Sequence, residues 1–221
     1  MALSSPKPIP IPTLTVLDVP IHQTDMATAL TQIDTFVQSG VPHHIVTADA
    51  SMLVIAHEDA ELKQIVQSAD LITPDGAGLL WASKRLKQPL QERVSGVVLV
   101  EKFCALSPER GYRLYFLGAA PHVAEQAGEQ MRTKYPGAHI VGTRDGFFTA
   151  DDLPALLEEI RSARPDILCV ALGIPKQEKF IAQHKAALGV PVLIVVGGTF
   201  DVLSGNLRRA PLWMQRLNLE W

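Results

Sequence analysis

The chain has 221 residues, 47% of them hydrophobic, which suits one domain of ordinary size with a sizeable core. Its formal charge of −3 gives no basic excess and argues against a nucleic-acid-binding protein. Its two cysteines, Cys104 and Cys169, lie in apolar stretches, so we expect buried thiols rather than a disulfide or a metal site.

The first residues of the chain differ in composition from the rest. Residues 1–13 are broken by prolines and predict a loose, extended leader without a signal peptide. Residues 14–221 carry no internal repeat or linker and are interpreted as a single domain. No stretch reaches the roughly 18 apolar residues of a membrane span, so any work at a membrane is expected from its surface.

The first half of the domain begins with a predicted strand at 14–19 and a helix that Thr24 caps and that runs to about Ser39. The other elements predicted there are a strand at 43–48, helices near 50–57 and 60–67, a strand at 70–76, and helices near 78–86 and 95–106.

In the second half, apolar strands alternate regularly with helices. They are strand 112–118, helix 121–135, strand 138–143, helix 150–163, strand 166–173, helix 176–188 and strand 191–197. This alternation indicates an α/β fold, a Rossmann-like sandwich whose mostly parallel sheet is covered by helices on both faces.

Ligands of such sheets bind beyond the carboxyl ends of the strands. Five polar or glycine-rich loops follow predicted strands: 47–51, 73–78, 142–148, 173–179 and 197–205. That all five loops follow strands is the main evidence for a site that the residues alone provide.

The loop TPDGAG holds the best candidate for a general base. Asp75 stands between a proline that stiffens the turn and Gly76, which lets the chain reverse. A plain surface turn is the alternative. Gly76 and Gly78 give only a weak dinucleotide signal, because Trp81 occupies the place of the third glycine.

The loop GGTFD, with Gly197, Gly198, Thr199 and Asp201, resembles the start of a nucleotidyltransferase but lacks the histidines that follow it there. Its glycines can bring backbone N–H groups close to a ligand, and Asp201 could accept a bond from a ribose or sugar hydroxyl. The alternative is a tight turn in which Asp201 caps a helix.

Cations begin the helix at 176–188. Lys176 and Lys179 oppose the helix dipole there, so an anion such as a phosphate could compensate them, and Gln177 suits a sugar. A solvated first turn is the alternative.

Four further loop positions complete the set of candidates. Arg93, before the helix at 95–106, could clamp a diphosphate. Phe147 could stack on a base, although core packing of Phe147 and Phe148 competes with this role. Gly118 and Gly173, at two other strand ends, complete the substrate-binding candidates.

Three blocks together carry a family resemblance. They are DLITPDGAGLLWASKRLKQPLQERVSGVVLVEKFC, LGIPKQEKFI and VGGTFDVLSGNLRRAPLWMQRLNLEW. In this order they resemble the WecG/TagA/CpsF glycosyltransferases, and the similarity runs from about residue 14 to the end.

The resemblance implies an activity. It implies an inverting, metal-independent enzyme without cofactors that moves N-acetylmannosamine, or its uronic acid, from UDP to a polyprenyl-diphosphate-linked N-acetylglucosamine. Such an enzyme serves cell-envelope polysaccharide or teichoic acid synthesis, at the cytoplasmic face of the cell membrane and as a homo-oligomer, expected to be a dimer.

The resemblance also implies residue roles. Asp75 matches the base, Thr47, Arg93 and Gln177 match catalytic-pocket residues, and Asp201 lies near the UDP. Asp49 stands where the family commonly has asparagine, and because an acid replaces a neutral amide, we expect a different acceptor or sugar preference.

The C-terminal end is a second departure from the family. Family members usually continue with a basic membrane-docking segment, whose start we see in Leu212, Trp213, Met214, Leu217 and Trp221. We therefore expect that segment to be missing after 221.

Two other functions remain open from the sequence. They are a nicotinamide-dependent oxidoreductase, weakened by the absence of GxGxxG after the first strand, and a non-catalytic nucleotide-sugar-binding protein.

Overall fold

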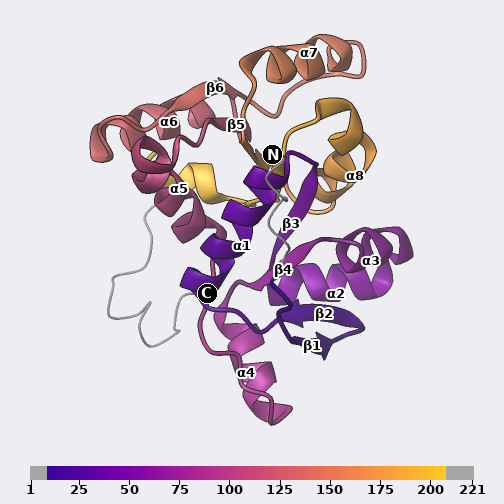
Figure 1. Ribbon diagram of the computed structural model, residues 1–221. Helices are drawn as coiled ribbons and strands as arrows, with labels where there is room; N and C mark the ends of the chain where they lie inside the picture. Colours follow the sequence, from indigo (N-terminus) through magenta and orange to yellow (C-terminus); the bar gives the residue numbers. More distant parts are fainter. Residues whose placement is uncertain (1–8, 208–221) are drawn as a thin grey trace, which may run out of the picture.

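The structure is a computed structural model that describes residues 9–207. It is an α/β sandwich in which helices cover both faces of a six-stranded sheet (Figure 1). The strands of this sheet are β3 (His43–Ala48), β4 (Leu71–Pro74), β5 (Leu114–Gly118), β6 (Ile140–Arg144), β7 (Ile167–Ala171) and β8 (Val192–Val195). The predicted fold class is confirmed.

The strands lie in the order β4-β3-β8-β7-β5-β6, and every neighbouring pair is parallel. All six carboxyl ends therefore meet at one edge of the sheet. The five loops singled out in the sequence all leave this edge, as predicted.

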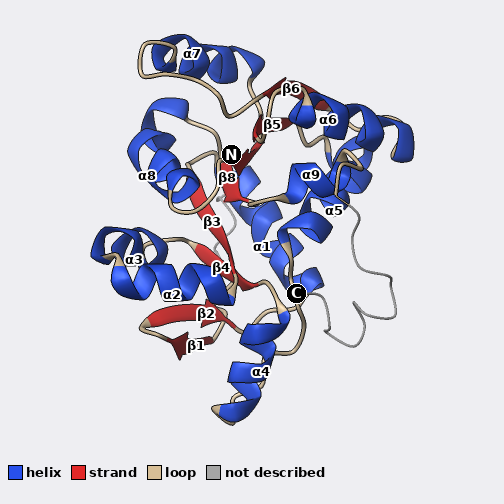
Figure 2. Ribbon diagram, turned by 180° about the vertical axis from the view of Figure 1, so that it is seen from behind, coloured by secondary structure: helices blue, strands red, loops and turns tan. Residues whose placement is uncertain are grey.

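The helices are α1 (Met26–Ser39), α2 (Ala50–Glu58), α3 (Ala60–Gln67), α4 (Ala77–Arg85), α5 (Gly96–Arg110), α6 (Val123–Lys134), α7 (Leu153–Ala163), α8 (Lys176–Leu188) and α9 (Thr199–Leu203). Buried side chains of α1, α5, α6 and α9 form one core. Those of α2, α3, α4, α7 and α8 form the other, on the opposite face of the sheet. Figure 2 shows the short α9 beside α5, next to the end of β8.

Side chains of the central strands alternate between these two cores. On β8, Val192 and Ile194 enter the first core, while Leu193 and Val195 enter the second. Burial on both faces explains why this strand has a continuous apolar sequence instead of a polar alternation.

The first predicted strand is wrong. The region 14–19 belongs to an antiparallel hairpin of β1 (Thr13–Val16) and β2 (Val19–His22). Leu17 and Asp18 have φ of 47° and 66°, the left-handed pair of a two-residue hairpin turn. A leucine is unusual in such a turn, and it hid the break between two apolar runs.

The predicted cap of α1 is also wrong. The side chain of Asp25, not of Thr24, accepts the N–H of Thr28 at 2.7 Å. Thr24 is buried, and its hydroxyl donates to the carbonyl of Asp25. Aspartate and threonine are both good caps, so their adjacency left the sequence ambiguous by one residue.

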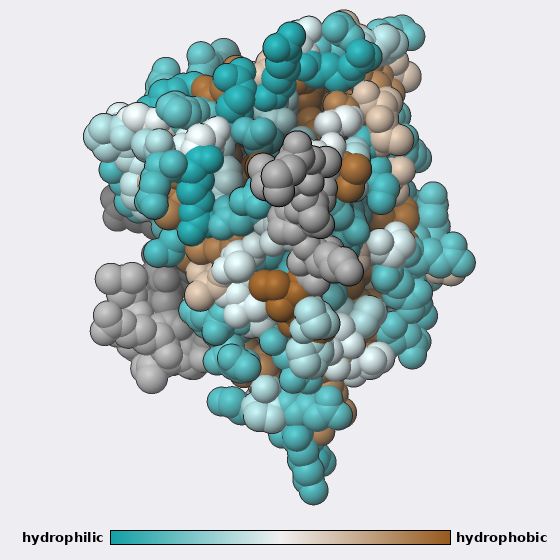
Figure 3. Space-filling view, in the orientation of Figure 1, coloured by the Kyte–Doolittle hydropathy of each residue, from teal (hydrophilic) through white to brown (hydrophobic). Residues whose placement is uncertain are grey.

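Both cysteines are buried free thiols, as expected. Within residues 9–207, no helix combines the length and the apolar character that a membrane crossing requires. Polar residues cover most of the face in Figure 3, and apolar side chains form only small groups on it. Most of the predicted leader and the predicted C-terminal docking segment lie outside the described residues.

Candidate active site

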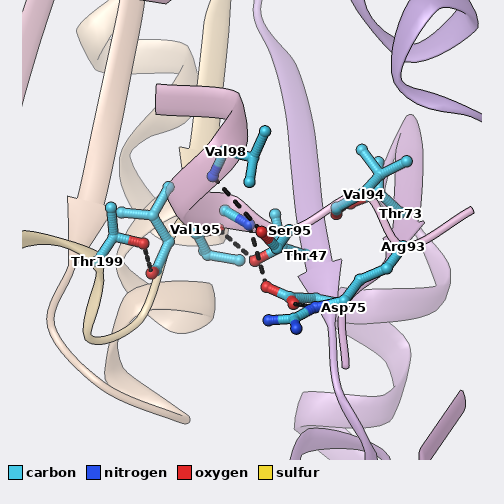
Figure 4. A network of polar contacts seen from close by, with 11 residues as sticks. Thr47, Thr73, Asp75, Arg93, Val94, Ser95, Val98, Val195 and Thr199 are labelled. Atoms are coloured by element: carbon cyan, nitrogen blue, oxygen red, sulfur yellow. Dashed lines mark hydrogen bonds and ion pairs between the residues drawn. The ribbon is translucent and has the colours of Figure 1, made fainter. Parts of the chain in front are cut away.

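Asp75 lies just beyond the end of β4, where it contacts the end of β3, the start of α5 and the segment that precedes α5. Its N–H donates to the carbonyl of Ala48 at the end of β3. Its Oδ2 accepts the backbone N–H of Gly96, the first residue of α5, at 3.0 Å. Its Oδ1 accepts Nε–H of Arg93 at 3.2 Å, and Figure 4 shows the two side chains together. The side chain of Asp75 is only 22% exposed.

Burial raises the pKa of Asp75 above the ordinary aspartate value. The Gly96 N–H and the Arg93 guanidinium lower this pKa, whereas the nearby charge of Asp49 raises it. Because burial outweighs the two stabilising contacts, the carboxylate holds a proton more readily than a surface aspartate does. A raised pKa makes a carboxylate a better proton acceptor, as a general base must be.

The segment before α5 is fastened to the end of β4. The N–H of Val94 donates to the carbonyl of Pro74, and Thr73 Oγ1 donates to the carbonyl of Val94. Ser95 then caps α5. These contacts fix the positions of Arg93 and Gly96 relative to Asp75.

Gly96 is also the point where α5 touches the neighbouring strand ends. A Cβ on this residue would lie 3.3 Å from Thr199 Oγ1 and 3.4 Å from Thr47 Oγ1. Both threonine hydroxyls donate to backbone carbonyls at the end of β8, Thr47 to Val195 and Thr199 to Val196. The two threonines therefore hold the site together, whatever further contacts they make with a ligand.

Asp49 caps α2, as its Oδ1 accepts the N–H of Met52 and the hydroxyl of Ser51. It lies beside the Asp75 turn, because a Cβ on Gly76 would be 3.7 Å from the Cβ of Asp49. Gly76 itself has φ 101° and ψ 152°, a conformation open essentially only to glycine. The reversal after Asp75 thus depends on this glycine.

Gln177 connects the start of α8 to the glycine-rich turn after β8. Its Oε1 accepts the N–H of Gly197 at 3.3 Å, and its Nε2–H donates to Oε1 of Glu178 at 2.9 Å. Both side chains are almost wholly buried. Burial raises the pKa of Glu178, and the charge of Asp49 adds to that rise.

Glu178 is a residue that the sequence reading missed. Its signal was the helical period, since it lies three residues before the buried Ile181 and so shares the inward face of α8. A carboxyl group on that face cannot be a solvated first-turn residue.

The expected anion beside Lys179 comes from the protein itself. Its Nζ lies 2.5 Å from Glu61 Oε2 and 3.5 Å from Asp59 Oδ2, which ties α8 to the start of α3. Lys179 is therefore compensated by carboxylates of the protein, and no phosphate is needed to explain its place on the helix. Lys176 and Lys179 both line a cavity.

That cavity has a volume of about 900 Å³ and lies where the loops after β5, β6 and β7 face α8. Its lining includes Ala119, Phe147, Phe148, Leu172, Lys176 and Phe180. Phe147 is 73% exposed, so core packing of this ring is excluded, whereas Phe148 packs edge-on against Phe180. Gly118 and Gly173 flank the lining residues, and a Cβ on Gly118 would collide with the carbonyl of Ala171 at 2.2 Å.

The sequence-predicted residues thus fall into two groups. Thr47, Asp49, Asp75, Gly76, Arg93, Gln177, Gly197 and Thr199 lie around the ends of β4, β3 and β8, and Gly118, Phe147, Gly173 and Lys176 lie around the cavity. Gly198 is the N-cap of α9 with no side-chain cap bond, and Asp201 is the third residue of that helix, so Asp201 is not its cap. Among residues 9–207, no three His, Cys, Asp or Glu side chains are placed to hold a metal ion.

A doubly covered parallel sheet with a half-buried carboxyl group at its carboxyl edge is typical of a Rossmann-like enzyme. The model of the "Glycosyl transferase WecG/TagA/CpsF family" matches residues 14–221. The chain therefore belongs to this family, and the resemblance seen in the sequence is confirmed.

Curated relatives support the same family. Three examples bear the name N-acetylglucosaminyldiphosphoundecaprenol N-acetyl-beta-D-mannosaminyltransferase. That of Bacillus spizizenii is 36% identical over 177 residues, which are 80% of this chain and 68% of the relative. That of Bacillus subtilis strain 168 is 30% identical over 210 residues, 95% of this chain and 81% of the relative. That of Staphylococcus aureus strain NCTC 8325 is 31% identical over 208 residues, 93% and 81% respectively. These matches do not favour the nicotinamide-dependent alternative.

Proposed function

We propose that this glycosyltransferase moves N-acetylmannosamine, or its uronic acid, from UDP to N-acetylglucosamine carried on a polyprenyl diphosphate. The names of the relatives support the acceptor and the mannosamine configuration. The UDP donor, the inversion at the anomeric carbon and the independence from metal are parts of the proposal. So are the homo-oligomeric state and the place of work, the inner face of the cell membrane.

The observation that carries the proposal is the half-buried carboxyl group of Asp75, fixed by Gly96 and Arg93. In the proposed step, Asp75 takes the proton of an acceptor hydroxyl as that oxygen attacks the anomeric carbon. A new C–O bond forms on the face opposite UDP, and the bond between the anomeric carbon and the diphosphate oxygen breaks. UDP leaves with the bonding electrons, and the proton stays on Asp75.

Arg93 has two partners in this scheme. It pairs with Asp75 in the structure, and a diphosphate placed beside it competes for the same guanidinium. As Arg93 turns toward the leaving phosphate, Asp75 loses a contact that lowers its pKa and becomes a stronger base. Departure of UDP and removal of the proton are thereby favoured together.

The order of the strands suggests how the donor lies. We place the uridine in the cavity at β5 and β7, the diphosphate over the turn after β8, and the sugar at the ends of β3 and β4. From β7 to β4 the sheet crosses three strand spacings, about 14 Å. The backbone is open along this line, because a Cβ on Gly173, Gly197 or Gly198 would meet no atom within 4 Å.

Measurement of UDP release tests the proposal. The assay uses a set of UDP-sugars with a short-chain lipid-diphosphate N-acetylglucosamine as acceptor, in buffer containing EDTA. We expect release from UDP-N-acetylmannosamine or its uronic acid only when the acceptor is present. UDP bound but never released from any sugar would instead favour a nucleotide-sugar-binding protein.

A further inference from the structure

The end of α4 and the turn after it, residues 81–89, form an exposed projection that we call the α4 tip. In Figure 1, α4 extends away from the sheet at the lower end of the molecule. Its contacts with the core come from the buried Leu79 and the partly buried Leu80. Trp81 is 70% exposed and Leu86 is 49% exposed.

Hydrogen bonds fix the backbone of the α4 tip, so Trp81 and Leu86 are held in exposed positions. The N–H groups of Leu86 and Gln88 donate to the carbonyls of Ala82 and Ser83. The Ser83 hydroxyl accepts the N–H of Leu90 at 3.1 Å and pins the returning chain. A fixed, exposed tryptophan on a projecting helix is a feature of an interaction surface.

The charge of the α4 tip has one sign. Lys84, Arg85 and Lys87 are all exposed, and the sequence from 77 to 91 contains no aspartate or glutamate. Trp81, Lys84 and Arg85 are spaced i, i+3 and i+4, so they share one face of the helix. This face combines an amphipathic aromatic ring with cations whose stems are apolar.

We propose that the α4 tip docks on an anionic lipid bilayer, with Trp81 and Leu86 in the headgroup region and the three cations on lipid phosphates. Tryptophan prefers this boundary, because its ring is apolar and its N–H is polar. Basic residues beside it are attracted by the negative surface potential of anionic lipids. Charge complementarity thus selects a membrane as the partner.

The position of α4 in the chain indicates what this docking does for catalysis. This part of the inference rests on the proposed function. The helix begins two residues after Asp75 and has nine residues, so its far end lies about 14 Å from its start. Docking at that end holds the catalytic turn at a short, fixed height above the lipid. A sugar on a diphosphate reaches Asp75 from there, while its polyprenyl chain remains in the bilayer.

Vesicle flotation tests the docking without any substrate. The full chain is mixed with vesicles of phosphatidylcholine and phosphatidylglycerol, or of phosphatidylcholine alone. Trp81→Ser with Leu86→Ser removes the apolar contact and lowers binding to the mixed vesicles by at least about tenfold. Lys84→Glu with Lys87→Glu lowers it by about 25-fold or more, because each basic residue near an anionic surface contributes about a factor of five.

Matched substitutions elsewhere serve as controls. Val41→Ser changes a side chain that is 55% exposed beyond the end of α1, and Lys102→Glu reverses an exposed charge on α5. Both controls are expected to bind vesicles like the wild type. Equal binding by the wild type and both α4-tip variants would overturn the proposal.

A second copy of the chain is the competing occupant of this surface. If Trp81→Ser with Leu86→Ser shifts the protein from dimer to monomer in gel filtration and leaves vesicle binding unchanged, the surface is a protein interface and the proposal fails. Activity separates this inference from the proposed function. The variants should transfer to a short-chain acceptor in solution at the wild-type rate, and at a reduced rate to acceptor embedded in vesicles. Absence of transfer by the wild type would contradict the proposed function and leave the flotation result standing.

Discussion

The carboxylate of Asp75 accepts the first backbone N–H of α5, that of Gly96, at 3.0 Å. An N–H group at a helix start is free to bond outside its helix, and the helix dipole favours a negative charge there. Yet burial still raises the pKa of Asp75. The carboxyl group is therefore oriented by α5 without being fully stabilised as an anion.

This balance predicts how stability depends on Asp75. A carboxyl group whose pKa is raised on folding contributes stability below its unfolded pKa, and that contribution is lost as the pH rises through the folded value. At neutral pH the ionised Asp75 is thus a net cost to the fold. We expect Asp75→Asn to unfold at the same temperature as the wild type or a few degrees higher, with the difference vanishing in acid. A lower unfolding temperature for the variant in calorimetry at pH 7 would show that the Arg93 pair dominates.

The Gly76 turn should tolerate no side chain. At φ 101° and ψ 152° an alanine costs about 1–3 kcal/mol of backbone strain, and relief of that strain would turn Asp75 away from Gly96. Gly76→Ala is expected to lower the unfolding temperature and to abolish transfer. Gly40→Ala is the control, because Gly40 also has positive φ, with open space, but precedes β3, at the edge of the sheet opposite the site. The control should lose some stability and keep its specific activity; loss of activity in both would assign the effect to stability alone.

Glu178 should act on activity through Gln177. Glu178→Leu leaves the Gln177 Nε2 without its partner and frees the amide to rotate away from Gly197. Glu178→Gln restores an acceptor oxygen, so it should keep UDP affinity and turnover near wild type. We expect Glu178→Leu to weaken UDP binding, measured by calorimetry, about as much as Gln177→Leu does. The double variant should be no worse than either single one; additive losses would mean that the two residues act independently.

The cavity prediction concerns Phe147. If the uracil ring stacks on this side chain, Phe147→Ala should weaken UDP binding by about 2- to 10-fold, the range of an aromatic pair. Stability should change little, because the ring is largely exposed. Val41→Ala, at another exposed apolar position, is the control and should bind UDP normally. Unchanged affinity in Phe147→Ala would remove the nucleotide from this cavity.

Local patterns predicted much of the fold. Helices α3 and α8 begin and end at the predicted residues, 60–67 and 176–188. Their boundaries were predictable because capping residues and apolar periodicity are local features of the sequence. The hairpin was missed, because its left-handed turn contains a leucine where glycine or asparagine would have signalled it. The edge of the sheet was predictable, because every site loop follows an apolar strand.

The contacts within the site were less predictable. Lys179 finds its carboxylate on Glu61, 118 residues away, and only the packing of α3 on α8 brings them together. The Asp75–Arg93 pair was not foreseen either, although both residues were candidates; each had been assigned a ligand instead. Sequence thus identified the residue types that carry the chemistry, while tertiary structure decided which of them face each other.

The most direct test compares transfer and UDP binding in the wild type and Asp75→Asn. The measurement follows UDP release from UDP-N-acetylmannosamine with a lipid-diphosphate N-acetylglucosamine acceptor, alongside calorimetric titration of UDP. Loss of a general base lowers the rate by about 10²- to 10⁴-fold, and the asparagine variant should still bind UDP like the wild type. Transfer by Asp75→Asn at the wild-type rate would contradict the assignment of Asp75 as the base.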